Sequence, residues 1–221
     1  MRVVSDPVPR SVPRPYSPIA WPSGDVVQLQ PCLRPVTVDL AALIEQRQTR
    51  REFANAMPDD ALGEFLWLVC RNRSSRPSPY GFQQESRAHP SAGALHPIHV
   101  LVGREGGPWA RYEPIEHALV TLPGSEANLA AVRDKASRLV AVRCGVLVGF
   151  IAESGKTASK YENPESLVWR DAGTLLGYMS LVAEALRLQF CPLGLTGDPE
   201  LGDVLAPQSG LHGAGLSIVS I

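Results

Sequence analysis

The stretch that most restricts how this chain can fold is DAGTLLGYMSLVAEALRL, residues 171–188. At helical spacing its apolar side chains go nearly all the way round the helix; they are Leu175, Leu176, Tyr178, Met179, Leu181, Val182, Ala183, Ala185, Leu186 and Leu188. A soluble helix of this kind needs cover on most of its sides. We therefore predict a long buried helix that packs against its own sheet on one face and against a second copy of the chain on another, which makes the protein a homodimer.

Strands and helices are interleaved along the rest of the chain. Strands are expected at residues 96–103, as a turn-linked pair within 110–122, at 144–153 and at 214–221, and helices from residue 37, after Pro58, over 126–140 and, short and capped, over 197–206. Residues 70–86 are expected to form a polar loop. The short connections within 112–122 require antiparallel pairing, and the continuously apolar run at 144–153 belongs in the middle of a sheet. The predicted class is α+β, with a central, mostly antiparallel sheet flanked by helices.

Proline is frequent in residues 1–35, which we expect to form an N-terminal arm, whereas residues 36–221 form one domain. Two interpretations of the arm stay open. It is either a disordered tail or a segment that wraps a partner subunit.

Composition argues against several classes of partner and site. The chain has 21 Lys and Arg against 22 Asp and Glu, so nothing favours a nucleic-acid or a membrane partner. Its four cysteines are widely spaced, without a metal-site or disulfide pattern, which is typical of reduced thiols in the cytoplasm. No stretch resembles a signal peptide or a membrane span. We expect a cytoplasmic protein without a metal site.

Two stretches contain residues suited to ligand binding. In RQTRREF, residues 47–53, two guanidinium groups and a hydroxyl can converge on one anion, and arginine binds phosphate bidentately. In PSAGALHP, residues 90–97, glycine and alanine let a planar ligand approach the main chain. Alone, the first stretch is better explained as a solvated basic helix end, and the second can also be explained as a tight helix-to-strand corner.

Further candidates are histidines and an adjacent pair. His89, His96 and His99 suggest a metal site, but their spacing matches no standard one. Lys160 and Tyr161 stand next to each other in a polar segment, and both can act as a general acid or base. Alone, the pair is an ordinary exposed dipeptide.

Several motifs in this order carry a family resemblance. RQTRREF, LGEFLWLV, PSAGALHP, RYEPIEHALV, KY and DAGTLLGYMSLVAEALRLQFCPLG together resemble the nitroreductase superfamily of flavin enzymes, and within it the SagB/ThcOx-type dehydrogenases. PSAGALHP and YEPIEHAL are the most specific parts, close to the family's PSAGALYP and YxPxxHxL, and the resemblance extends over residues 36–221. It implies a nitroreductase-like α+β fold and a homodimer with FMN at the subunit interface.

The resemblance also implies which residues bind FMN. The segment for the ribityl phosphate and flavin edge is matched by Arg47, Gln48, Thr49 and Arg51. The loop along the isoalloxazine is matched by Pro90, Ser91, Ala92 and Gly93, and the segment over the other side of the ring by Pro192, Leu193 and Gly194. In two places the chain departs from the family, with Asp171 where Glu is common and Thr174 where His is common.

Lys160 and Tyr161 resemble the Lys-Tyr pair that azoline dehydrogenases of this family use near the substrate. The implied activity is FMN-dependent dehydrogenation of a peptide or peptide-derived natural product, in which one of the pair takes a proton from a thiazoline or oxazoline ring and hydride passes to FMN. Two alternatives stay open. One is an NAD(P)H-dependent nitro or quinone reductase, and the other a flavin-poor scaffold subunit that serves partner proteins in a biosynthetic complex.

Overall fold

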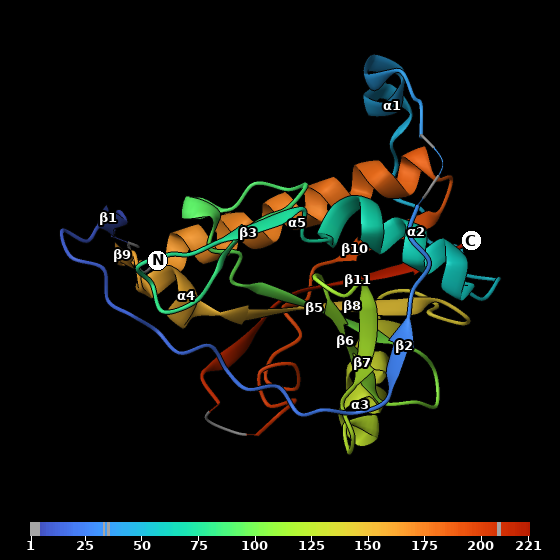
Figure 1. Cartoon of the computed structure of the whole chain (residues 1–221). Coiled ribbons are helices and arrows are strands. Elements are labelled where there is room, and N and C mark those ends of the chain that lie inside the picture. Colours follow the sequence, from blue (N-terminus) through green and yellow to red (C-terminus); the bar gives the residue numbers. More distant parts are fainter. Residues whose placement is uncertain (1–4, 33, 35, 207–208) are drawn as a thin grey trace.

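The fold is built around one antiparallel sheet. The computed structural model describes residues 5–32, 34, 36–206 and 209–221 (Figure 1). Seven strands pair in the order β10-β11-β8-β5-β6-β7-β2, and every neighbouring pair is antiparallel. Their bounds are β2 Val26–Gln28, β5 Ile98–Gly103, β6 Trp109–Glu113, β7 Ala118–Thr121, β8 Val146–Glu153, β10 Gln189–Leu193 and β11 Leu211–Ser220. All of β8 is buried between β11 and β5, which confirms its predicted central place.

Helices cover the two faces of this sheet (Figure 1). The helices are α1 Leu40–Gln46, α2 Asp59–Cys70, α3 Glu126–Ser137, α4 Ser154–Ala158 and α5 Glu165–Ala185. Because side chains alternate across a strand, Val100 and Phe150 pack with α2 and α5, whereas Leu101 and Ile151 pack with α3. Each large side chain buried in this way contributes roughly 1.5–3 kcal/mol to stability. The α+β class and the flanked antiparallel sheet are as predicted.

Helix α5 is long but is buried on one face only. Val168, Leu175 and Met179 are among the residues that it packs toward the sheet. On its outer side Trp169 is 47% exposed and Tyr178 is 37% exposed. Within a single chain, therefore, the sheet covers one face of the helix, and the predicted cover by a second copy stays a prediction.

Two sequence-based expectations differ from the structure. Residues 70–86, expected to form a polar loop, contain a small antiparallel hairpin of β3 (Ser74–Arg76) and β4 (Gln84–Ser86). Its strands are short and largely polar, so they leave no alternating apolar pattern in the sequence. The helix expected over residues 197–206 is a series of turns. There the Asp198 carboxylate accepts from the main-chain N–H of Gly213 on β11, so it does not cap a helix.

The N-terminal arm lies along its own chain. Its β1 (Val8–Pro9) pairs with β9 (Tyr161–Glu162), and its β2 forms the last strand of the central sheet. Figure 1 shows the arm crossing one face of the molecule between these two contacts. Residues 1–4, 33 and 35 of the predicted arm lie outside the described residues. No helix in the described ranges is long and apolar enough to cross a membrane.

Candidate functional site

The loop at residues 90–93 is fixed by a carboxylate from α5. Ser91 Oγ donates to Asp171 Oδ2 over 2.6 Å, and Ala92 N–H donates to Asp171 Oδ1 over 3.0 Å. Ser91 Oγ in turn accepts from the main-chain N–H of His96 over 2.9 Å. Burial raises the pKa of Asp171, although the hydrogen bonds from Ser91 and Ala92 act to lower it. Sequence analysis noted Asp171 only as a departure from the family. The signal for its role is its helical spacing with Val168 and Leu175, which puts a carboxylate on the buried face of α5.

Lys160 and Tyr161 lie directly against this loop. Residues 92–94 form a single 3-10 turn in which Gly93 has a φ of 65°. A Cβ atom added to Gly93 would lie 2.9 Å from Lys160 Nζ and 3.2 Å from Tyr161 Oη. Two of the segments singled out from the sequence therefore meet, and the absence of a side chain at Gly93 is what lets them do so.

The main chain of the pair is held by the arm. Tyr161 lies in β9, where it is paired with Pro9 of β1. Arg10 donates its main-chain N–H to Lys160 O over 2.8 Å and its Nε to Ala158 O over 2.9 Å. Nothing in the sequence pattern indicated this contact, because it is made mainly to backbone atoms.

The segment at residues 47–51 lies elsewhere, just after α1. Arg47, Gln48, Thr49 and Arg51 are exposed, and neither Arg47 nor Arg51 has an ion-pair partner in the part of the chain that the structure describes. Arg50, which the sequence did not single out, is the residue that anchors this segment. Its Nη2 donates to Glu184 Oε1 over 2.9 Å, and this contact lowers the pKa of Glu184.

The predicted binding segments do not all converge within one chain. Asp171 holds the 90–93 loop near the start of α5, and Glu184 holds the 47–51 segment near its end. At about 1.5 Å of rise per residue, these two carboxylates are about 20 Å apart along the helix. Pro192 and Leu193 lie in β10, the strand that follows the end of α5, and Gly194 comes directly after that strand.

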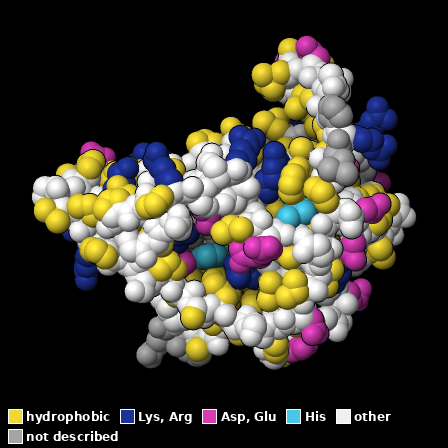
Figure 2. Space-filling view, viewed as in Figure 1, with side chains coloured by type: hydrophobic (Ala, Val, Ile, Leu, Met, Phe, Trp, Pro, Cys, Tyr) yellow, Lys and Arg dark blue, Asp and Glu magenta, His cyan; other side chains and the backbone are white. Residues whose placement is uncertain are grey.

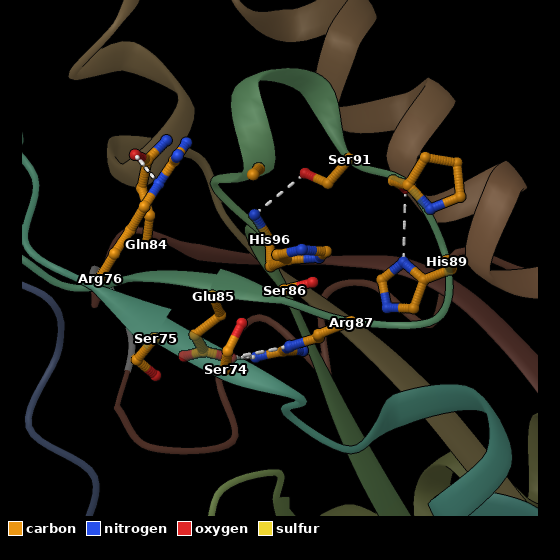
Figure 3. A pocket seen from close by; sticks show the side chains of 12 residues that line it. Ser74, Ser75, Arg76, Gln84, Glu85, Ser86, Arg87, His89, Ser91 and His96 are labelled. Atoms are coloured by element: carbon orange, nitrogen blue, oxygen red, sulfur yellow. Dashed lines mark hydrogen bonds and ion pairs between the residues drawn. The ribbon is translucent and has the colours of Figure 1, made fainter.

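A pocket of about 460 Å³ adjoins the 90–93 loop (Figure 3). One wall is the β3–β4 hairpin, and the other consists of residues between Arg87 and His96. Gln84 links the two walls, since its Nε2 donates to Gly93 O over 2.7 Å. Most of the residues that line it have polar side chains, among them serine hydroxyls and the Arg76 and Arg87 guanidinium groups.

The three candidate histidines are divided between two places. His89 and His96 line the pocket with ring centroids 5.0 Å apart, and burial lowers their pKa values to about 4 and about 2, so both are neutral. His99 instead contacts Glu153 through Nε2 over 2.7 Å. No cluster of three His, Cys, Asp or Glu side chains suited to a metal ion occurs among the described residues.

This geometry can combine binding with proton transfer. The loop presents small residues on a rigid turn, and an amine and a phenol stand within contact distance of it. A flat ligand on the loop would lie close to a general acid or base. The polar pocket next to it offers donors and acceptors to a second group.

Comparison with known proteins gives a family and a fold. The family model described as the Nitroreductase family matches residues 44–212. No curated protein matches the sequence. Among solved structures, a "putative nitroreductase" from Ralstonia eutropha JMP134 is 20% identical, with a TM-score of 0.72, covering 97% of this chain and 96% of that one.

Two more distant structures share the fold. The Escherichia coli microcin synthetase McbBCD complex, with truncated pro-MccB17 bound, contains a chain that is 18% identical, with a TM-score of 0.58, covering 86% of this chain and 77% of that one. A "putative nitroreductase" from Desulfovibrio desulfuricans in complex with FMN is 17% identical, with a TM-score of 0.54, covering 86% and 87%. At these identities the likeness establishes the fold.

Proposed function

The chain belongs to the nitroreductase family of flavin oxidoreductases, and we propose that it binds FMN and dehydrogenates a peptide or peptide-derived natural product of the azoline type. The observation that supports the proposal is the closeness of Lys160 and Tyr161 to Gly93, where an added Cβ would lie 2.9 Å from Lys160 Nζ and 3.2 Å from Tyr161 Oη. Our candidate base is thus next to the loop that we expect to lie along the flavin. The structural likeness to a chain of the microcin synthetase complex, a protein with a peptide bound, supports a peptide substrate.

The residues present fit FMN. Ser91, Ala92 and Gly93 are small residues that let a planar ring approach the main chain, and Asp171 fixes that loop. Arg47 and Arg51 are exposed guanidinium groups without a carboxylate partner in the described ranges, so they are free to bind a phosphate. When bound, FMN would supply the acceptor for the hydride that leaves the azoline ring.

The chain's own residues would position the substrate and take its proton. Lys160 or Tyr161 would accept the proton that an azoline ring loses as it becomes an aromatic azole, because both lie at the loop. The pocket beside the loop would hold the neighbouring peptide, whose N–H and C=O groups suit its serine, arginine and histidine side chains. Hydrogen bonds from Arg10 keep the main chain of the pair in place.

The proposal includes a homodimer. The phosphate segment and the ring loop of one chain lie near opposite ends of α5, so we propose that each FMN lies between two copies. Exposed apolar residues support this arrangement: Tyr178 on α5, and Leu40 and Ile44 on the projecting α1, which are 64% and 56% exposed (Figure 1). Burying these apolar side chains against a second copy of the chain would be favourable, because it removes apolar surface from water.

Substitution of Lys160 and Tyr161 tests the proposed activity directly. We expect Lys160→Ala and Tyr161→Phe to remain yellow, dimeric proteins that release FMN, yet to oxidise azoline-containing peptides about 10²- to 10⁴-fold more slowly. The rate is measured as bleaching of the flavin absorbance without oxygen, and the mass by sedimentation. Lys135→Ala is the control, since that lysine pairs with Glu200 away from the loop.

Three results would contradict parts of this proposal. Full activity of both variants would remove the pair from catalysis. A wild-type protein that reduces nitro or quinone compounds with NAD(P)H, but never oxidises peptides, would make it a general reductase. A colourless monomer that does not take up added FMN would favour the scaffold role.

The carboxylate of Asp171 gives a second prediction. In Asp171→Asn only one oxygen remains to accept from Ser91 and Ala92, and an amide N–H faces a donor. An unsatisfied group costs about 1–3 kcal/mol. We expect FMN to bind at least about 10-fold more weakly, measured by flavin fluorescence on titration of the apoprotein. Asp134→Asn, an exposed helix residue, should bind FMN normally; equal affinity of both variants would show that the loop does not depend on Asp171.

A further inference from the structure

A second pocket lies under the N-terminal arm, apart from the residues assigned to FMN and catalysis. Its volume is about 340 Å³. Pro18, Ile19 and Trp21 of the arm line one side, with Phe82 beside them. The opposite side includes polar residues of β5, β6, β8 and α4: His99, Arg111, Glu113, Glu153 and Lys156. Figure 2 shows basic, acidic and histidine side chains gathered on the face that the arm crosses.

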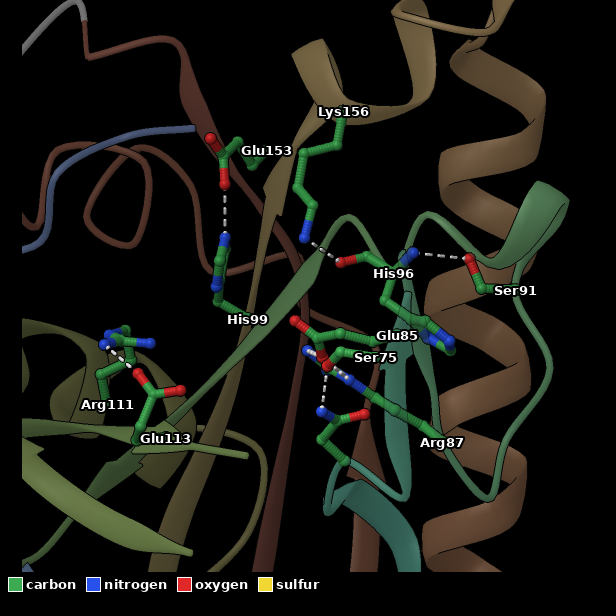
Figure 4. A network of polar contacts seen from close by, with 11 residues as sticks. Ser75, Glu85, Arg87, Ser91, His96, His99, Arg111, Glu113, Glu153 and Lys156 are labelled. Carbon is green, nitrogen blue, oxygen red and sulfur yellow. Dashed lines mark hydrogen bonds and ion pairs between the residues drawn. The ribbon is translucent and has the colours of Figure 1, made fainter. Parts of the chain in front are cut away.

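The carboxylates that line this pocket already have partners (Figure 4). Glu153 Oε1 accepts from the main-chain N–H of Ile19 and Oε2 contacts His99 Nε2, each over 2.7 Å. Glu113 pairs with Arg111, and Glu85 pairs with Arg87, each over 2.6 Å. None of the three therefore needs a cation from a ligand.

In contrast, several donors that line the pocket lack a carboxylate partner or have no partner at all among the described residues. Lys156 is 7% exposed, and its Nζ donates to His96 O over 3.1 Å, with no carboxylate within ion-pair distance among the described residues. Trp21 Nε1 and Arg111 Nε are buried and have no hydrogen-bond partner in the part of the chain that is described. Burial lowers the pKa of Lys156 to about 8, so its amine is still mostly protonated at neutral pH. Among the residues described, the pocket therefore lacks a hydrogen-bond acceptor for the Trp21 and Arg111 groups and a carboxylate partner for Lys156.

We propose that this pocket binds a small organic carboxylate with an aromatic or apolar body. A single negative charge matches the one pocket lysine that has no carboxylate partner among the described residues, and the carboxylate oxygens would accept from Lys156 with Trp21 or Arg111. The rest of the ligand would lie between the Trp21 and Phe82 rings and the apolar arm residues. A bare ion would leave most of the volume unfilled.

This ligand would also join separate parts of the fold. Trp21 belongs to the arm, Arg111 to β6 and Lys156 to α4, so a bound carboxylate would clamp the arm onto the sheet. The inference does not depend on flavin chemistry, because no residue of the proposed FMN site lines the pocket.

The test is calorimetric titration of the purified full-length protein with benzoate and with indole-3-acetate, alongside acetate and inorganic phosphate. We expect at least one aromatic carboxylate to bind saturably and to raise the midpoint of thermal unfolding. Lys156→Met, which keeps the length of the side chain, should weaken binding about ten-fold or more. Trp21→Phe should weaken it less, and Lys135→Met should leave it unchanged.

Failure of both aromatic carboxylates to bind the wild type would overturn the proposal. So would binding that Lys156→Met and Trp21→Phe leave untouched, because the site would then be elsewhere. Phosphate or acetate binding as tightly as the aromatic acids would likewise overturn the assigned ligand class. Flavin absorbance recorded in the same titrations separates a ligand at the FMN site from one under the arm.

Discussion

Replacing Gly93 with alanine is expected to slow substrate oxidation about 100-fold while the fold persists, since displacing a catalytic group by about 1 Å costs about that much. The added Cβ would lie 2.9 Å from both Cδ and Nζ of Lys160 and 3.2 Å from Tyr161 Oη. The end of a lysine side chain moves easily, so the added methyl group would displace the side chains of Lys160 and Tyr161 and would leave the packing of the core unchanged. The measurement is the anaerobic rate of flavin bleaching by an azoline-containing peptide, together with the unfolding midpoint.

A matched control exists at Gly106. Its φ of 75° is close to the 65° of Gly93, but nothing lies within 4 Å of an added Cβ. Gly106→Ala therefore introduces the same backbone strain, about 1 kcal/mol, without the contact. If the two variants lose activity equally, backbone strain alone is responsible and the contact with the pair has no catalytic role.

Replacing Glu153 with alanine is expected to lower the free energy of unfolding by about 3 kcal/mol, because buried donors would lose their acceptor. Glu153 is 1% exposed and accepts from Ile19 N–H and from His99. Tyr16 of the arm also lies near Glu153. Burial, and after it the negative charge of Glu153, raise the pKa of the Tyr16 phenol to about 12. For a chain of this size, the midpoint of thermal unfolding would fall by about 10 °C.

The same variant should free the arm. Limited proteolysis is expected to cut near Ile19 in Glu153→Ala before it cuts the wild type. Glu162→Ala is the control, since its side chain is 59% exposed in its ion pair with Arg10, and such pairs contribute less than about 1 kcal/mol. Equal midpoints for the two variants would show that Glu153 does not anchor the arm.

Acid titration gives an independent check on Glu153. Burial acts to raise its pKa, but the contact with His99 and the Ile19 N–H outweigh this, and the pKa is lowered from 4.5. Its contribution to stability is therefore complete above pH 4.5 and is lost as the pH falls through the lower pKa of the folded state. The difference in stability between wild type and Glu153→Ala should therefore shrink as the pH falls below 4.5.

The sequence predicted those elements that bury apolar side chains. The strand at β8 and the helix after Pro58 were recognisable because burial imposes a continuous run or a helical period. The β3–β4 hairpin was not predicted because its strands are short and largely polar, and so bury few apolar side chains. Residues 197–206 were predicted to form a short capped helix, but in the structure the Asp198 carboxylate accepts from Gly213 N–H instead.

Less of the candidate site could be predicted from the residues alone. The small-residue loop and Lys160 with Tyr161 were recognised separately, and only the fold brings them into contact. The role of Asp171 depends on which turn of α5 faces the loop, and the contacts of the arm go largely to backbone atoms, which every residue has. The segment at Arg47 is not brought to the loop within one chain, so the role that we propose for it requires a second copy of the chain.

The contacts of the arm determine the order in which the molecule can be completed. Val8 pairs with Glu162 and Val26 with Val120, so the arm precedes its partner strands in the sequence by a long interval. During synthesis the arm emerges while neither partner exists, and closing such distant contacts is slow. The edge of β7 is therefore covered only once the distant β2 has met it, and the backbone around Lys160 reaches its final position only after most of the chain has been translated. A chain without the arm would expose the edge of β7 and would lack the contacts that hold the backbone of Lys160, the residue that we propose as a base.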